Sequence, residues 1–176
     1  MAAVAQPRAA LPPLPAEMIG DLWYRISEDA PFAVAENEVH YLSAVALGLD
    51  DDLASVLLLK KLKLAKKLAP GSVPDDLAVM NSFVEFRAGE GKRRLGQLLH
   101  PSVAREPFGL SVASRLGAGL VGLRAGQSIL WPDDIGELQP LQVFSVRPAH
   151  WRMRRPRLKR AGPPADSRNS QQERMK

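Results

Sequence analysis

The chain has 176 residues, of which 45% are hydrophobic, so it can bury the core of one domain, or of a small domain with appendages. The absence of cysteine excludes disulfides and thiolate metal sites, and it fits a cytoplasmic protein. A net charge of +5 favours partners with phosphate backbones or acidic surfaces, and the lack of an apolar span of about 18 residues argues against a membrane helix.

Residues 1–15 form an Ala- and Pro-rich leader that we expect to be extended or disordered. It lacks the apolar core of a secretory signal. A helix is predicted over 16–27, because five apolar residues recur there at helical spacing: Met18, Ile19, Leu22, Trp23 and Ile26. We expect Trp23 to pack on the helices that follow.

Two further amphipathic helices are predicted over 36–49 and 53–68, which completes a helical region at 16–69. Between them lie Asp50, Asp51 and Asp52, and we expect Asp51 or Asp52 to cap the second helix. Two such helices joined by a short polar loop predict an antiparallel helical hairpin with an acidic tip.

The second of these helices carries a lysine cluster made of Lys60, Lys61, Lys63, Lys66 and Lys67. Such a cluster suits a phosphate backbone or an acidic protein surface. A solvated helix face is the interpretation that we prefer.

A linker at 70–76, built around Pro70, Gly71 and Pro74, leads into a small α+β domain at 77–148. Its predicted strands lie at 79–86, 94–99, near 110, at 128–131 and at 138–146. One short helix is predicted around Leu116, Leu120 and Leu123, and it ends at the polar turn 124–127.

The remaining segment, 149–176, is predicted to be a basic disordered tail. A cationic run begins just before this segment and continues into it, comprising Arg147, Arg152, Arg154, Arg155, Arg157, Lys159 and Arg160. Nucleic-acid binding and a passive solvated tail explain this run about equally well.

Three segments carry a resemblance to a known family, and they occur in the order VMNSFVEF, LSVASRLGAGLVGLRAGQSILW and LQPLQVFSV. They are similar to the C-terminal domain of the GreA/GreB transcription elongation factors, and most similar to the shorter Rnk-type regulators of nucleoside diphosphate kinase. The resemblance covers 36–148 and is strongest over 77–131. It implies an FKBP-like antiparallel sheet with one short helix, preceded by the hairpin, and RNA polymerase as the partner.

The resemblance also implies two sets of site residues. In longer Gre factors the acidic hairpin tip helps to hold a catalytic Mg²⁺, and Asp50, Asp51 and Asp52 occupy that tip here. The helix predicted over 53–68 has about 16 residues and spans only about 24 Å. This length argues against the three Asp residues reaching the polymerase active centre. The family docks on polymerase through a loop that corresponds to Ala113, Ser114, Arg115 and Leu116.

Two interpretations of that loop stay open. Arg115 would pair with an acidic polymerase surface, or it would mark a changed mode of docking. Ser114 is either part of the docking loop or simply the cap of the helix that follows.

Residues typical of an independent active site are missing. The three histidines, His40, His100 and His150, lack metal-ligand spacing, and neither a nucleophile elbow nor a phosphate-binding loop occurs. We therefore predict no catalytic residue, metal, cofactor or small-molecule substrate.

The favoured hypothesis is a non-catalytic regulator that binds RNA polymerase near its secondary channel and modulates transcription elongation. The alternatives are a transcript-cleavage factor acting through the acidic tip and a nucleic-acid-binding module acting through the basic tail.

Overall fold

A computed structural model describes residues 14–105 and 108–149. The predicted leader and basic tail lie outside these residues, apart from their innermost ends. The elements in chain order are α1 (Ala16–Ile26), β1 (Ala33–Ala35), α2 (Glu36–Leu47), α3 (Asp52–Leu64), β2 (Lys66–Leu68), β3 (Phe83–Ala88), β4 (Arg94–Leu99), β5 (Gly109–Ser111), α4 (Arg115–Leu120), β6 (Ser128–Pro132) and β7 (Leu138–Arg147). The prediction of a mixed α+β fold is confirmed.

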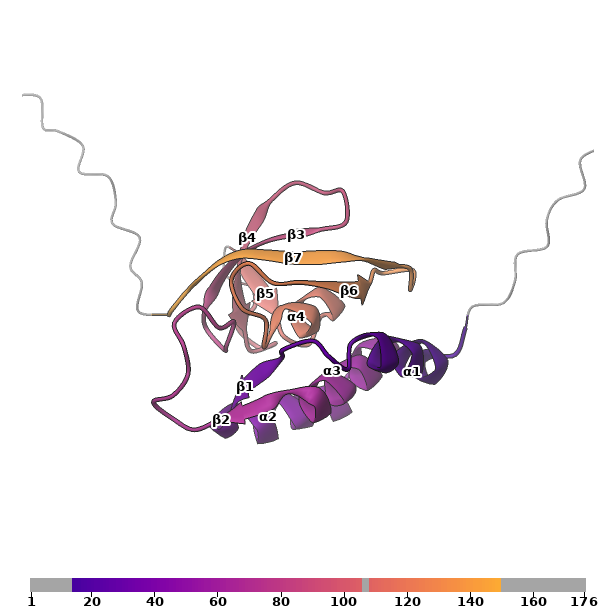
Figure 1. Ribbon diagram of the computed structural model, residues 1–176, viewed down its shortest axis with the longest axis horizontal. Helices are drawn as coiled ribbons and strands as arrows, with labels where there is room; N and C mark the ends of the chain where they lie inside the picture. Colours follow the sequence, from indigo (N-terminus) through magenta and orange to yellow (C-terminus); the bar gives the residue numbers. More distant parts are fainter. Residues whose placement is uncertain (1–13, 106–107, 150–176) are drawn as a thin grey trace, which may run out of the picture.

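The larger sheet has the strand order β5-β4-β3-β7-β6. Figure 1 shows this sheet above a layer formed by α1, α2 and α3, with the short α4 between them. The prediction of an antiparallel sheet is wrong for one pair, because β4 and β5 are parallel. The short strand β5 pairs with the second half of β4, from Gln97 opposite Gly109 to Leu99 opposite Ser111, and both strands run in the same direction.

Helix α3 is shorter than the helix predicted over 53–68. Ala65 adopts an extended backbone conformation, with ψ at 135°, and ends the helix. Residues Lys66–Leu68 form β2, which pairs in parallel with β1, and the Lys66 amide donates a hydrogen bond to the Phe32 carbonyl (2.9 Å). The predicted end of this helix is therefore wrong, because residues 66–68 form backbone hydrogen bonds with the β1 segment, which is distant in sequence, instead of continuing the helix.

Helix α4 also ends earlier than predicted, at Leu120, since Val121 is already extended (φ −57°, ψ 132°). Gly122 follows with φ at +81°, in the left-handed region that glycine favours. A Cβ atom at this position would lie 2.7 Å from the Ala33 carbonyl oxygen. Glycine thus allows the chain to turn tightly against β1, while the predicted helical residue Leu123 is still fully buried.

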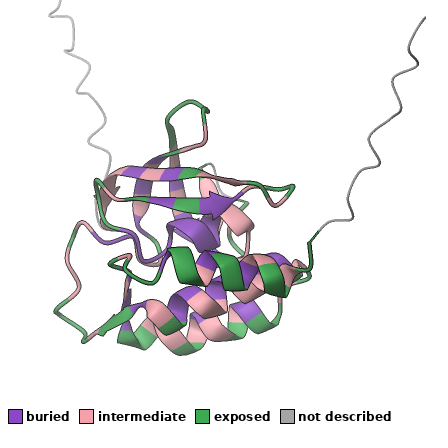
Figure 2. Cartoon of the chain, turned by 45° about the vertical axis from the view of Figure 1, so that its right-hand side comes forward, coloured by how far each residue is buried: buried purple, intermediate pink, exposed green. Residues whose placement is uncertain are grey.

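One hydrophobic cluster contains residues from both the helical region and the larger sheet. At its centre Trp23 stacks on Phe32 (5.7 Å between ring centroids) and meets Trp131 edge-on (5.1 Å). The Trp23 Nε1–H donates to the Leu130 carbonyl (2.8 Å), which ties α1 to β6. Figure 2 shows the buried faces of the helices and of the sheet turned toward each other. The proposed division at 70–76 stays a prediction.

Among the helices of the described ranges, none has the length and apolar character needed to cross a membrane.

Candidate functional site

The turn between α2 and α3 is fixed by Asp51. This residue is the N-cap of α3, and its Oδ1 accepts a hydrogen bond from the Ala54 amide (3.0 Å). The prediction that Asp51 or Asp52 caps this helix is therefore confirmed for Asp51. Its second oxygen, Oδ2, faces the guanidinium of Arg115, at 2.8 Å from Nη2 and 3.2 Å from Nε.

Arg115 is the first residue of α4, and local hydrogen bonds set its position. The Ser114 Oγ caps α4 by accepting from the Gly117 amide (3.0 Å), and its hydroxyl donates to the Ser111 carbonyl (2.7 Å). The carbonyl of Arg115 accepts from Trp131 Nε1 (2.8 Å), so the backbone is also held against β6.

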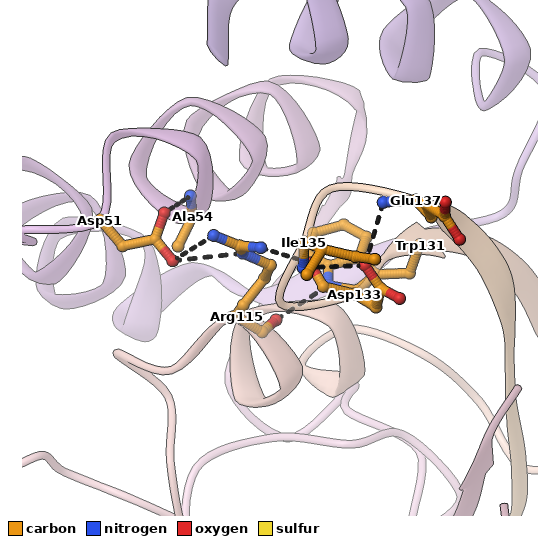
Figure 3. A network of polar contacts seen from close by, with 7 residues as sticks. All are labelled: Asp51, Ala54, Arg115, Trp131, Asp133, Ile135 and Glu137. Atoms are coloured by element: carbon orange, nitrogen blue, oxygen red, sulfur yellow. Dashed lines mark hydrogen bonds and ion pairs between the residues drawn. The ribbon is translucent and has the colours of Figure 1, made fainter. Parts of the chain in front are cut away.

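A third segment completes the contact. Arg115 Nη1 donates to the carbonyl of Asp133, at the start of the β6–β7 turn. The Asp133 carboxylate in turn accepts from the amides of Ile135 (3.0 Å) and Glu137 (2.9 Å), which shapes that turn. Figure 3 shows Arg115 between Asp51 and Asp133, and we call these three residues the Arg115 junction.

The junction brings together two sets of residues that the sequence placed in separate roles. Asp51, from the predicted acidic tip, pairs with Arg115, from the predicted docking loop, across 64 positions of sequence. Only 15% of the Arg115 side chain is exposed, so little of its charge is presented to a partner. The roles assigned to both sets of residues stay predictions.

The remaining predicted site residues do not converge. Asp50 and Asp52 are exposed, whereas Ala113, Ser114 and Leu116 are half-buried beside Arg115. Arg147 ends β7 opposite Phe83, and the rest of the cationic run lies outside the described residues. Within residues 14–105 and 108–149, no three His, Asp or Glu side chains are grouped so that they could hold a metal ion.

Lys61 is the residue that sequence reasoning missed. It is 2% exposed, so the interpretation of the lysine cluster as a solvated helix face is wrong at this position. Its Nζ donates to the carbonyls of Ala118 (3.2 Å) and Gly119 (2.5 Å), in the last turn of α4. These carbonyls have no partner within a helix that ends at Leu120, so Lys61 joins α3 to the C-terminal end of α4.

The environment of Lys61 is otherwise apolar. The ammonium position lies 5.2 Å from the ring centroid of Phe32 and 5.3 Å from that of Trp131. Burial holds the pKa of Lys61 well below its ordinary value of 10.5. Its helical spacing from Ala54, Leu57 and Leu58, all buried on the apolar side of α3, was the signal that could have placed it inward.

We expect the two side chains of the Arg115–Asp51 pair to be coupled by about 1 kcal/mol, because Arg115 is only 15% exposed whereas Asp51 is 38% exposed, so that water screens the pair in part. The variants are Asp51→Asn, which keeps a capping oxygen but removes the charge, and Arg115→Met. Urea unfolding of both single variants and of the double variant measures the coupling.

The matched control cycle pairs Asp52→Asn with Arg115→Met, since Asp52 is exposed and makes no ion pair with Arg115. Its effects should add within about 0.5 kcal/mol. Equal coupling in the two cycles would contradict a specific Asp51–Arg115 interaction.

Comparisons with known proteins find relatives of similar sequence and a solved structure of similar fold. No protein-family model matches it. Over 84 residues it is 36% identical to the "Regulator of nucleoside diphosphate kinase" of Escherichia coli K12 and to the protein of that name from Shigella flexneri. The match covers 47% of this chain and 62% of each relative, so it spans less than two thirds of their length.

Among solved structures, the chain is similar to a "Prokaryotic transcription elongation factor GreA/GreB from Nitrosomonas europaea". The TM-score is 0.53 at 22% identity, and the alignment covers 68% of this chain and 99% of the other. The resemblance to GreA/GreB factors and Rnk-type regulators that the sequence indicated is thereby confirmed. At this level of identity the likeness to the solved structure shows the fold alone.

Proposed function

We propose that this protein is a non-catalytic regulator that binds RNA polymerase near its secondary channel and modulates transcription elongation. The observation that carries the proposal is the sequence match to a named regulator within a chain whose fold is similar to that of a GreA/GreB factor. In this proposal α2 and α3 act as a short antiparallel hairpin, and the larger sheet with α4 acts as an FKBP-like docking domain.

The Arg115 junction favours regulation by occupancy over assistance to catalysis. Asp51 caps α3 and pairs with Arg115, so one of the three carboxylates at the proposed tip already has two partners. A metal ion supplied by the polymerase would have to compete with both of them. The relatives' name adds nucleoside diphosphate kinase as a proposed downstream target.

Binding to purified core RNA polymerase in competition with a GreA-type factor tests the proposal. We expect the two proteins to exclude one another, because they would occupy the same channel entrance. The measurement is the fluorescence anisotropy of the labelled chain as the competitor is added. Absence of binding, or simultaneous binding of both proteins, contradicts the proposal.

A cleavage assay on stalled polymerase separates the proposal from the transcript-cleavage alternative. We expect the wild-type chain to leave Mg²⁺-dependent RNA cleavage unchanged. The variant Asp50→Asn/Asp52→Asn is the matched control, since it removes the two exposed carboxylates and keeps the Asp51 cap. Stimulation by the wild type that this variant loses would establish the alternative.

A further inference from the structure

Helix α1 has a second apolar face that the fold does not cover. Its inner face is buried, with Trp23 fully inaccessible in the core. On another side Met18, Leu22 and Ile26 follow one another at every fourth position and are 54%, 51% and 49% exposed. Such a row is the pattern of a helix that packs on two sides, and only one of those packing partners belongs to the described part of this chain.

The β6–β7 turn extends this apolar surface. Ile135 at its tip is 79% exposed. The turn lies against α1, since Ile19 Cδ1 is 3.6 Å from the point where a Cβ on Gly136 would stand. We call Met18, Leu22, Ile26 and Ile135 the α1 patch; Figure 2 shows the exposed side of α1 below the sheet. Neighbouring exposed apolar side chains of this kind usually mark an interaction site.

Acidic side chains surround the α1 patch, although the chain as a whole carries a net charge of +5. Glu17 and Asp21 lie on α1, and Asp134 and Glu137 lie in the β6–β7 turn; all four are exposed. Of these four, Asp21 has an ion-pair partner in the described structure, Lys60 at 2.9 Å. Positive charge lies at the other half of the helix, where Arg25 is exposed and Lys60 and Lys63 lie over the Tyr24 ring. The surroundings of the patch are therefore negative toward the start of α1 and the β6–β7 turn.

This charge selects among the possible occupants. A symmetric pair of chains would bring the same acidic surroundings face to face, which disfavours a second copy. Nucleic acid and anionic lipid would be repelled for the same reason. A protein surface with an apolar centre and Lys or Arg around it complements both the patch and its charge.

We infer that the α1 patch is a docking surface for such a basic-rimmed apolar protein surface. The inference rests on the proposed function in that the partner surface is taken to belong to RNA polymerase. It moves the main contact away from the predicted docking residue Arg115, which is engaged within the chain, to α1 and the β6–β7 turn.

The test compares the affinity of core RNA polymerase for two Lys-substituted variants. Met18→Lys/Leu22→Lys places cations in the patch, and we expect it to weaken binding by about 30-fold or more. The matched control is Val103→Lys/Phe108→Lys, at positions that are 49% and 59% exposed and lie outside the patch. We expect less than about a twofold change for the control, and unchanged thermal unfolding for both variants because all four positions are exposed.

A second variant tests the charge of the partner without touching the apolar residues. Glu17→Lys/Asp134→Lys should weaken binding and reduce its dependence on salt, since it removes attraction to a basic surface. An unchanged affinity and salt dependence would overturn the assignment of a basic partner. Sedimentation velocity should show a monomer; a wild-type dimer that the patch variant abolishes would overturn the inference in favour of a second copy.

The outcomes separate this inference from the proposed function. If wild-type protein fails to bind polymerase, the proposed function fails, and this docking partner fails with it. If wild-type protein binds and the patch variant binds as tightly as the control, polymerase binding stands and the α1 patch is not the docking surface. Equal weakening by patch and control variants also overturns the inference.

Discussion

Replacing Gly117 by alanine should destabilise the protein by about 3 kcal/mol or more, the largest effect that we expect from adding a single methyl group. A Cβ atom there would lie 2.0 Å from the carbonyl oxygen of Ser111 and 3.0 Å from the Cα atom of Val112. Both are backbone atoms that belong to, or directly follow, β5, so no side-chain rotation relieves the contact. Helix α4 would have to move away from the strand.

That movement would disturb the neighbouring contacts as well. The Ser111 carbonyl also accepts a hydrogen bond from the Ser114 hydroxyl, and Ser114 caps α4. Helix α4 in turn carries Arg115 at its start and, at its end, the carbonyls that bind Lys61. We therefore expect Gly117→Ala to weaken binding to polymerase as well as stability. Urea unfolding, monitored by tryptophan fluorescence, measures the stability.

The matched control is Gly48→Ala at the C-terminal end of α2. Gly48 has φ at −97°, and its nearest neighbour to an added Cβ would be the Ala44 carbonyl oxygen at 3.5 Å. Its effect should stay within about 0.5 kcal/mol. An unfolding midpoint for Gly117→Ala that matches this control would show that α4 is not held against the β5 backbone.

The elements that could be predicted from the sequence are those that local patterns determine. The strand predicted at 94–99 is β4 with the same bounds, because the preceding turn built on Gly89 and Gly91 marks its start without reference to the rest of the chain. The caps at Asp51 and Ser114 are also local, since each side chain bonds an amide three residues ahead. Residues Lys66–Leu68 were mispredicted because their partner, β1, is distant in sequence.

The candidate site depended on contacts that no local pattern contains. The Arg115–Asp51 pair joins positions 64 residues apart. The sequence therefore predicted a separate role for each residue but not the contact between them. The apolar residues of α1 predicted a helix with Trp23 packed inward, but they did not show that Met18 and Leu22 face outward. A helix with apolar residues on more than one side gives no unique orientation until its packing partners are known.

Replacing Lys61 by methionine should destabilise the protein by about 3 kcal/mol near pH 10 and by less near pH 6. Methionine has a similar length but leaves the carbonyls of Ala118 and Gly119 without the donor they have in the wild type. Neutral lysine has two N–H groups, enough to serve both carbonyls, so deprotonation removes the cost of the buried charge and keeps the hydrogen bonds.

The pH dependence follows from the lowered pKa of Lys61, whose cause is burial. Between the folded pKa and the ordinary value of 10.5, the unfolded chain holds a proton that the folded chain lacks. The free energy of unfolding of the wild type therefore rises with pH across this window, whereas Lys61→Met lacks that contribution. When the free energies of unfolding of the two proteins are subtracted, the contributions of all groups whose titration the substitution leaves unchanged cancel.

Denaturant unfolding of both proteins at several pH values from 6 to about 10.5 gives this difference directly. The control is Lys63→Met, since it also removes one lysine from the same helix but at an exposed position, away from the carbonyls of Ala118 and Gly119. A flat difference for Lys61→Met would mean that the ammonium keeps its ordinary pKa in the fold. The contact between α3 and α4 would then be a charged cap on the α4 dipole, stabilising at every pH in this range.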